Sequence, residues 1–278
     1  MEDLTKRAWE IFRQVQEKRP LVQCITNFVT VNDCANIILA AGGSPSMAHD
    51  IREAAEAVTM AQGLVCNLGA IGDTDAMEAA GKEANRRGIP VIFDPVAAGG
   101  TSLRRAEAAR LMRAVHFSVI RGNASEIRFL AGEQSSGSGV DAGMFDEITE
   151  ENLSAAIGIV KGLAEKTGSV IAVSGRLDLI SDSRRTAVLR NGSPVMARIT
   201  GSGCMLTALT GAFCGACQKD CFTAAFAASA VMGVCGELAD AKRLERGTGN
   251  ASFRNDLIDA VFTLTEKQFR EEINYEIF

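Results

Sequence analysis

Short apolar runs alternate with longer helical patterns along most of the chain, and this alternation constrains the fold more than any other feature. Strands that alternate with helices in this way form βαβ units, which require a mostly parallel sheet covered by helices on both faces. No low-complexity linker and no internal repeat divides the 278 residues. The sequence therefore predicts an α/β fold and a single domain over residues 1–278.

The pattern also gives approximate positions for the elements. The expected strands are the apolar runs at 21–25, 44–47, 64–68, 89–96, 117–121, 170–174, 178–180, 186–189 and 195–200. The expected helices are 2–18, 31–41, 50–61, 73–87, 102–115, 123–131, 149–167, 204–217, 221–241 and 253–270. A polar turn after 178–180 predicts a β-hairpin, and the polar stretch 132–148 predicts an exposed loop.

Charge and hydropathy exclude several classes of protein. The chain has 29 basic and 34 acidic residues, a net charge of −5 and no basic block, so neither nucleic acid nor an anionic membrane is an expected partner. The N-terminus is charged and amphipathic, unlike a signal peptide. The uncharged run 221–236 is shorter than the roughly 20 residues that cross a bilayer. We therefore expect a soluble cytoplasmic protein.

Eight cysteines raise the question of disulfides or a metal site. Most lie in apolar periodic segments and no export signal is present, which favours reduced thiols. Cys214, Cys217 and Cys221 have the spacing of one stripe along a helix. A metal site would need further ligands nearby, and the two histidines, His49 and His116, are distant in sequence. Core packing is the favoured interpretation of the stripe.

The stretch 199–207, ITGSGCMLT, predicts a strand, a tight glycine turn and a helix that begins at Cys204. The first turn of a helix has backbone N–H groups without partners, and Gly201 and Gly203 would let an anion approach them. Alternatively, these glycines only let the backbone turn, because a short glycine motif is a weak signal alone. Cys204 could be a small buried residue, or a thiol whose thiolate the helix dipole favours.

Polar residues gather where the expected strands end. Asp94 ends one strand, 121–123 (Arg-Gly-Asn) a second, Ser174 with Gly175 a third, and the glycine turn 201–204 a fourth. In an open parallel sheet, ligands bind outside the carboxyl ends of the strands. Four such ends together indicate a binding site there more strongly than any single motif.

The segment 123–126 allows two interpretations. Asn123 and Glu126 fit a helix capping box, and they equally fit a pair that holds Mg²⁺ near nucleotide phosphates. Asp94 is either a turn former before Pro95 or a second carboxylate at the metal, and Arg121 is either a surface charge or a cation at the phosphates. Two carboxylates, a cation and a helix N-terminus are the groups that phosphoryl transfer uses.

Two absent motifs narrow the choice further. There is no GxxxxGK[ST] phosphate-binding loop, which excludes a P-loop enzyme. There is no GxGxxG after the first expected strand, which argues against a nicotinamide-dependent dehydrogenase.

Together these residues resemble the ribokinase-like family and, within it, the hydroxyethylthiazole kinases. The resemblance spans nearly the whole chain and lies in the segments 23–50, 89–99, 120–127, 171–175 and 199–213. Its most specific feature is Cys204 after the glycine turn, where most ribokinase-like kinases have Asp. It implies a three-layer α/β/α fold and ATP- and Mg²⁺-dependent phosphorylation of the hydroxyl of 4-methyl-5-(2-hydroxyethyl)thiazole, in thiamine biosynthesis or salvage.

The resemblance also implies roles for individual residues. Cys204 matches the residue beside the substrate hydroxyl, and the backbone of 201–204, including Gly201 and Gly203, matches an anion hole. The other matches are as follows: Arg121, Ser174 and Asn123 with ATP; Asp94 and Glu126 with Mg²⁺; Met47, Gly201 and Asn27 with the thiazole. Family members form homotrimers with active sites at subunit interfaces, so we expect the same assembly here.

One mechanistic question stays open, and the sequence departs from the family pattern at a few positions. The hydroxyl proton is expected to pass towards Cys204, although a thiol is a poor base at pH 7 and its contribution could be positional. Ser174 and Ser202 stand where the family usually has Thr, and 247–253 is longer than the corresponding family turn.

Three other functions compete with this one. They are a hydroxymethylpyrimidine kinase of the same fold, an ATP-dependent dehydratase that repairs hydrated nicotinamide nucleotides, and a catalytically silent scaffold. Cys204 argues against the first two, whose relatives keep Asp at that position, and the intact set of polar residues argues against the third.

Overall fold

The computed structural model describes residues 3–132 and 147–278, and a mixed β-sheet lies at its centre. Within these ranges the sheet has nine strands in the order β2-β1-β3-β4-β5-β6-β7-β8-β9. Pairing is parallel from β2 to β6, and β7, β8 and β9 continue the sheet in antiparallel fashion. The strands are β1 Leu21–Ile25, β2 Ser44–Ser46, β3 Gly63–Asn67, β4 Val91–Asp94, β5 Val119–Asn123, β6 Val170–Ser174, β7 Asp178–Ser181, β8 Thr186–Leu189 and β9 Tyr275–Ile277.

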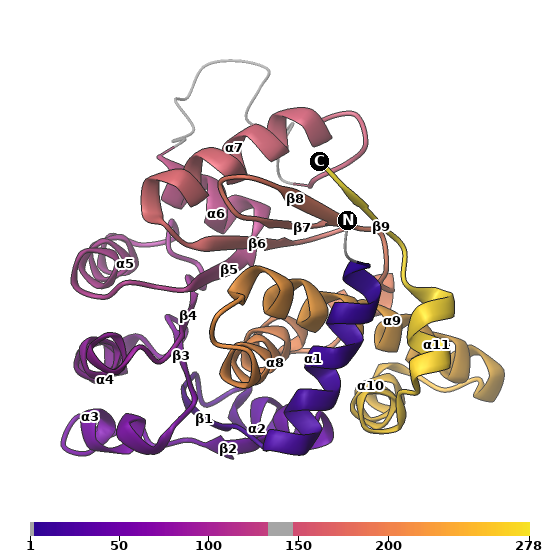
Figure 1. The fold of residues 1–278 in the computed structure, drawn as a ribbon, viewed down its shortest axis with the longest axis horizontal. Helices are drawn as coiled ribbons and strands as arrows, with labels where there is room; N and C mark the ends of the chain where they lie inside the picture. Colours follow the sequence, from indigo (N-terminus) through magenta and orange to yellow (C-terminus); the bar gives the residue numbers. More distant parts are fainter. Residues whose placement is uncertain (1–2, 133–146) are drawn as a thin grey trace.

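Helices cover both faces of the sheet (Figure 1). One face carries α1 Leu4–Lys18, α2 Val31–Ala40, α8 Ser202–Ala216, α9 Cys221–Arg246, α10 Asn250–Thr263 and α11 Glu266–Glu272. The other carries α3 Ala54–Ala57, α4 Thr74–Arg87, α5 Ser102–Ala114, α6 Ala124–Ala131 and α7 Leu153–Thr167. The predicted α/β class and three-layer arrangement are confirmed.

The sheet separates two hydrophobic cores, because successive side chains of a strand point to opposite faces. In β3, Leu64 packs with α4 and its neighbours, whereas Val65 packs with α8 and its neighbours. In β4, Ile92 and Phe93 divide in the same way. Strands buried on both faces need the continuous apolar runs that the sequence shows.

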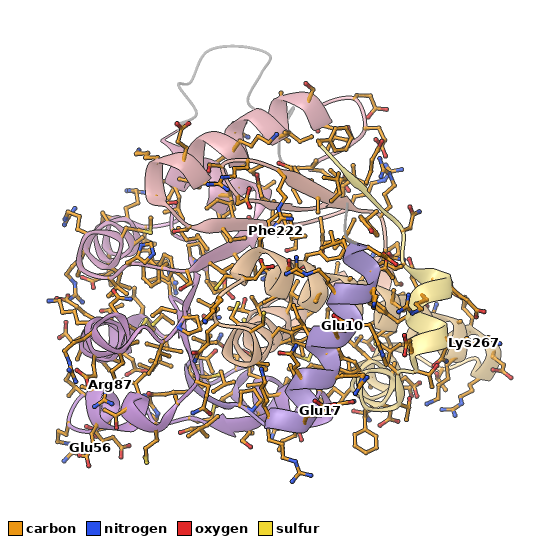
Figure 2. All side chains as sticks on the ribbon, viewed as in Figure 1. Glu10, Glu17, Glu56, Arg87, Phe222 and Lys267 are labelled. Carbon is orange, nitrogen blue, oxygen red and sulfur yellow. The ribbon has the colours of Figure 1, made fainter. Side chains whose placement is uncertain are left out.

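The side-chain view distinguishes the surface from these cores (Figure 2). Labelled charged residues such as Glu17 and Lys267 are exposed, whereas Phe222 is only 3% exposed. Phe222 is the second residue of α9, a helix of 26 residues that is long and apolar enough to cross a membrane. Of its most apolar window, 83% is buried inside the fold, as in the core helix of a globular protein.

The expected strand at 195–200 is wrong. Residues Pro194–Arg198 form a 3₁₀ turn, which Ser193 caps by accepting a hydrogen bond of 3.2 Å from the Val195 backbone N–H. Pro194 at the start of the turn explains the error, since its fixed φ suits the first position of a helix and it has no N–H to donate to a sheet. Three strand ends and one turn therefore meet at the carboxyl edge of the sheet, in place of four strand ends.

The C-terminal region also differs from prediction. The helix expected at 253–270 is two helices, α10 and α11, because Thr265 opens α11 with a capping box to Gln268. Strand β9 was not expected, and it pairs with β8. Cys217 ends α8 and Cys221 begins α9, so the three-cysteine stripe does not lie along one helix.

Other boundaries moved by less. The helix expected at 50–61 is reduced to α3 and a 3₁₀ turn, Val58–Met60. The helix expected from 149 begins at Leu153 after Asn152, and α9 continues to Arg246 before Gly247 ends it in a left-handed conformation. The predicted hairpin is confirmed as β7 and β8. Most of the expected loop at 132–148 lies outside the described residues.

Candidate active site

Polar side chains from separate strands meet at the carboxyl edge of the sheet, because parallel pairing aligns the strand ends. Asn67 at the end of β3 lies opposite Asp94 at the end of β4, and Asn123 of β5 lies opposite Ser174 of β6. The N-termini of α6 and α8 lie at the same edge. The predicted gathering of polar residues is therefore present.

Asp94 is the most deeply buried carboxylate of this group, with 2% of its surface exposed. Its Oδ2 accepts hydrogen bonds from Thr207 Oγ1 at 2.7 Å and from Asn67 Nδ2 at 3.0 Å. Burial raises the pKa of Asp94 to about 6, although the Arg121 cation and the Thr207 hydroxyl oppose the rise. Asp94 is thus a buried carboxylate that accepts two hydrogen bonds. Its role is therefore not limited to forming the turn before Pro95, which the sequence also allowed.

Arg121 lies beside Asp94 and is buried as well. Its Nη1 is 4.0 Å from Asp94 Oδ2, and its Nη2 donates a hydrogen bond to Ser174 Oγ. Its Nε is buried without a hydrogen-bond partner among the described residues. A buried guanidinium that retains an unused donor is suited to bind an anionic ligand, because an unsatisfied buried donor costs free energy.

Gly201 and Gly203 are each required for a different geometric reason. Gly201 caps α8 in the left-handed conformation, with φ of 88°, and a Cβ there would lie 2.6 Å from Thr30 Cγ2. A Cβ on Gly203 would lie 2.8 Å from Arg121 Nη1. Glycine at 203 therefore lets the guanidinium approach the first turn of α8.

The helix itself begins at Ser202, before the expected Cys204, and among the described residues no side chain caps its N-terminus. The N–H groups of its first turn and the positive end of its dipole are therefore available to an anion. The glycine turn is an open helix N-terminus as well as a bend in the chain.

Cys204 lies on this first turn, where its Sγ accepts hydrogen bonds from Asn67 Nδ2 at 3.3 Å and Asn27 Nδ2 at 3.4 Å. Burial raises the pKa of the Cys204 thiol, and the Asp94 carboxylate raises it further. Of the two interpretations that the sequence left open, the buried thiol is favoured over the thiolate, because burial opposes the charged form. Cys204 is a neutral thiol held by two amides.

Asn123 and Glu126 form the predicted capping box of α6. Asn123 Oδ1 accepts from the Glu126 N–H at 2.9 Å, and Glu126 Oε2 accepts from the Asn123 N–H at 2.8 Å. Glu126 Oε1 also accepts the N–H of Ala97 at 2.9 Å, and that residue has a positive φ of 52°. The capping interpretation is confirmed, while a role for Glu126 at a metal stays a prediction.

The protein alone offers few metal ligands here. Within residues 3–132 and 147–278 no group of three or more His, Cys, Asp or Glu side chains could hold a metal ion. Asp94 and Glu126 act on each other electrostatically across the site. Two carboxylates match Mg²⁺ when phosphate oxygens and water complete its coordination, which is its usual mode of binding.

Besides Gly201, two residues were assigned to the thiazole, Asn27 and Met47, and their surroundings differ. Asn27 joins the central network through Cys204, and its Oδ1 accepts from both the N–H and the hydroxyl of Thr30 at 3.1 Å. Met47 follows the edge strand β2 and is half-buried, with its carbonyl 3.0 Å from His49 Nδ1. Thr30 is the N-cap residue of α2, but its side chain makes no capping bond.

Asn67 and Thr207 belong to the site and were not recognised in the sequence. Asn67 links Asp94 to Cys204, and its Oδ1 accepts the Gly69 N–H at 2.8 Å. A polar residue at the end of an apolar strand was the available signal for Asn67. Thr207 follows Cys204 by three residues, so it faces the same side of α8, but an isolated threonine in a helix gave no signal.

Comparison with known proteins agrees with this geometry. A model of the hydroxyethylthiazole kinase family matches residues 12–267. A hydroxyethylthiazole kinase from Clostridium acetobutylicum is 44% identical over 97% of this chain and 99% of its own, and one from Methanocella arvoryzae is 45% identical over 95% of each chain.

Solved structures extend the comparison to the fold. The structure of a hydroxyethylthiazole kinase protein from Pyrococcus horikoshii is similar with a TM-score of 0.85 and 32% identity, covering 98% of this chain and 99% of the other. A pyridoxal kinase from Staphylococcus aureus, with a TM-score of 0.59 and 13% identity over 93% and 98% of the two chains, shares the ribokinase-like fold alone.

Proposed function

The chain belongs to the hydroxyethylthiazole kinase family, and from this premise we propose that it transfers the γ-phosphoryl group of ATP to the hydroxyl of 4-methyl-5-(2-hydroxyethyl)thiazole. We also propose that this reaction depends on Mg²⁺ and that it belongs to thiamine biosynthesis or salvage. One observation carries the proposal: the uncapped N-terminus of α8 lies beside the buried pair Arg121 and Asp94 at the carboxyl edge of the sheet.

The first proposed role is that of the open helix N-terminus. The N–H groups at 202–204 would donate to the oxygens of the transferring phosphoryl group, where negative charge is concentrated. Because Gly201 and Gly203 have no side chain, that group could approach the backbone. The bond to the substrate oxygen then forms as the bond from the γ-phosphorus to the bridging oxygen of ADP breaks.

Arg121 supplies positive charge to the same phosphates. Its Nε has no partner among the described residues, while the Ser174 hydroxyl and the Asp94 carboxylate hold the rest of the guanidinium in place. A positioned cation needs no reorganisation when charge moves during transfer, which is how such sites lower the barrier. Asn123, at the exposed end of β5, would contact ATP nearby.

Asp94 and Glu126 would hold Mg²⁺, with the ATP phosphates as its other ligands. Bound there, the ion would neutralise phosphate charge and orient the triphosphate. Thr207 and Asn67 fix Asp94 Oδ2, and two backbone N–H groups fix the Glu126 oxygens. Both carboxylates are therefore preorganised before a ligand arrives.

Cys204 would place the substrate hydroxyl and contribute less as a base. A neutral thiol with a raised pKa is a weak proton acceptor, and phosphoryl transfer through a loose transition state needs little help from a base. Asn27 and Asn67 fix the sulfur, which would define one wall of the thiazole site, with Met47 as a further contact.

A homotrimer with shared active sites is part of the proposal. Apolar side chains are exposed on the segments around β2, the strand at one edge of the sheet. They are Phe28, which is 90% exposed, Val29, Leu39, Ile51 and Met60. Phe28 follows Asn27 directly, so a second subunit on this surface would reach the thiazole site.

We also propose that residues 1–278 act as one cytoplasmic kinase domain. The family match over residues 12–267 and the sheet that continues from β2 to β9 support a single unit.

Acceptor-dependent release of ADP tests the proposed reaction. Purified protein would receive Mg²⁺ and ATP with hydroxyethylthiazole, with a hydroxymethylpyrimidine, or with no acceptor. We expect ADP release and a thiazole phosphate, seen by mass spectrometry, with the first acceptor alone. Faster turnover with the pyrimidine, or ADP release independent of any acceptor, would contradict the proposed substrate.

A further inference from the structure

A cavity of about 760 Å³ lies outside the candidate active site, among α4, α5, α6 and α7. Its lining includes His116 and Phe117, which precede β5, and Ser169, which precedes β6. The candidate active site lies at the opposite ends of these strands. Five-residue strands separate the two ends by roughly 16 Å, so this cavity is a separate site.

Part of its wall is apolar. Met112 of α5, Phe129 and Leu130 of α6 and Leu163 of α7 line it. Leu163 is buried in the core, whereas the other three are only half-buried, so the cavity exposes hydrophobic surface to water. A concave apolar surface of this volume is typical of sites for small organic molecules.

The charges around this apolar surface have one sign. Arg105, Arg113 and Lys166 line the cavity together with His116, and among the described residues no carboxylate belongs to the lining. Arg105 donates a hydrogen bond to the carbonyl of Gly99, but within the described ranges Arg113 and Lys166 have no hydrogen bond and no ion pair. This concentration of cations stands out in a chain with a net charge of −5.

The same helix shows how this protein compensates cations elsewhere. Arg110, one turn before Arg113 in α5, pairs with Asp75 at 2.9 Å, with Glu107 at 2.7 Å and with Glu78. On the side of α5 that faces α4 the cation is therefore paired with carboxylates, and on the side that faces the cavity the cations are not. Cations on a flat surface are simply hydrated, whereas cations around an apolar cavity attract an anion that also has an apolar part.

We propose that this cavity binds a small amphipathic anion, an aromatic or heteroaromatic ring that carries a carboxylate, sulfonate or phosphate group. The ring lies against Met112, Phe129 and Leu130, and the anionic group lies towards Arg113 and Lys166. Both parts are required, since an apolar ring alone leaves the cations unpaired and an inorganic anion leaves the apolar wall exposed.

A pair of fluorescent probes tests the need for charge. Anilinonaphthalene sulfonate has an aromatic ring system and one negative charge, and N-phenyl-1-naphthylamine has nearly the same rings without it. We expect saturable binding of the sulfonate that weakens as salt screens the cations. Binding of the neutral naphthylamine with equal affinity would overturn the proposal.

Charge reversal tests the location. Combining Arg113→Glu with Lys166→Glu should weaken binding of the sulfonate roughly tenfold or more, because two attractive contacts become repulsive. Lys161→Glu makes one such change on α7 at a residue outside the cavity lining, and it should leave the affinity within about twofold. Equal effects of the double variant and the control would overturn the proposal.

Two further measurements check that the variants fold and that the probe binds in this cavity. The double variant should remain folded with a modestly lower unfolding temperature, because Arg113 and Lys166 lie in the last turns of α5 and α7, where a cation stabilises the helix. Met112→Trp places an indole on the cavity wall, in a chain whose one other tryptophan, Trp9, is buried. Saturating sulfonate should quench the new emission more than that of the wild type, and equal quenching would place the probe elsewhere and overturn the assignment.

Discussion

Two helices begin at the carboxyl edge of the sheet, and their N-termini are treated in opposite ways. The first turn of α6 is closed by its own side chains, because Asn123 and Glu126 cap each other's backbone N–H groups. The first turn of α8 has a glycine at the cap position, and its N–H groups have no side-chain partner in the part of the chain that the structure describes. Since helix N-termini bind anions only when their N–H groups are free, α8 is the end suited to bind phosphate, and α6 supplies a fixed carboxylate.

Of the variants considered, Gly203→Ala should cause the largest loss of activity, because it alters the open N-terminus of α8. A Cβ at 203 would lie 2.8 Å from Arg121 Nη1, so the guanidinium must move away from the first turn of α8. We expect kcat to fall by about 100-fold or more, the usual effect of losing one preorganised electrostatic contact. The measurement is steady-state release of ADP.

Gly162→Ala in α7 is the matched control for this variant. A Cβ on Gly162 meets nothing within 4 Å, so the change should stabilise the helix slightly and leave kcat unaltered. Equal turnover by the two alanine variants would show that contact between Arg121 and the α8 turn is dispensable.

The buried carboxylate beside α8 should give the protein an unusual dependence on pH. Burial raises the pKa of Asp94 from 3.8 to about 6, so the folded state binds more protons than the unfolded state between these values. The free energy of unfolding should therefore fall as pH rises from 4 to 7, by about 3 kcal/mol for this group. Denaturant unfolding in a metal-chelating buffer measures the slope.

Asp94→Asn should remove much of this slope and stabilise the protein at pH 7. Asp178 needs its own variant, because burial raises its pKa to about 6 as well, against a hydrogen bond of 3.0 Å from the Gly175 N–H. Asp178→Asn should remove a second part of the slope. A slope that neither variant changes would contradict the assignment to these carboxyl groups.

Cys204→Ala should have an intermediate effect. The substitution removes the sulfur that accepts hydrogen bonds from Asn27 and Asn67, but it removes no charged base if the thiol is neutral. We expect about a tenfold loss of kcat, below the 10²–10⁴-fold contribution typical of general bases. Complete loss of turnover while ATP still binds would show that proton transfer to Cys204 is essential.

Glu126→Gln should have the smallest effect on the fold. It should separate the capping role of Glu126 from its proposed role at Mg²⁺. Glutamine preserves the capping box but has no negative charge, so the unfolding temperature should not change. The apparent affinity for Mg²⁺, measured from the Mg²⁺ dependence of turnover, should fall about tenfold.

The capping box of α11 provides the complementary control. Thr265→Ala removes a cap of the same kind and should destabilise the protein by about 1 kcal/mol without changing the response to Mg²⁺. If Glu126→Gln also left the Mg²⁺ response unchanged, Glu126 would be a capping residue alone.

The sequence predicted most of the parallel sheet because its strands are buried on both faces, and such strands need continuous apolar runs like those around Val65 and Ile92. It failed at 195–200, where β-branched and apolar residues indicated a strand but Pro194 starts a 3₁₀ turn. It also missed β9, a three-residue strand at the edge of the sheet with too few residues to show a period.

The site was predictable to the extent that it follows the strand ends. Asp94, Arg121 and Ser174 lie together because parallel pairing aligns the ends of β4, β5 and β6. Thr207 and the raised pKa of Cys204 depend on how deeply α8 packs against the sheet. Spacing along a single chain does not report that depth.

The most direct test of the open α8 N-terminus compares two glycine variants under saturating Mg²⁺, ATP and hydroxyethylthiazole. Gly201→Asp places a negative charge at this N-terminus, whereas Gly88→Asp imposes a similar left-handed strain, φ of 70° against 88°, at a position with nothing within 4 Å. We predict that Gly201→Asp lowers thiazole-dependent ADP release by at least about 100-fold while Gly88→Asp stays near the wild-type rate. Similar rates for the two folded variants would contradict the claim that the α8 N-terminus binds the transferring phosphoryl group.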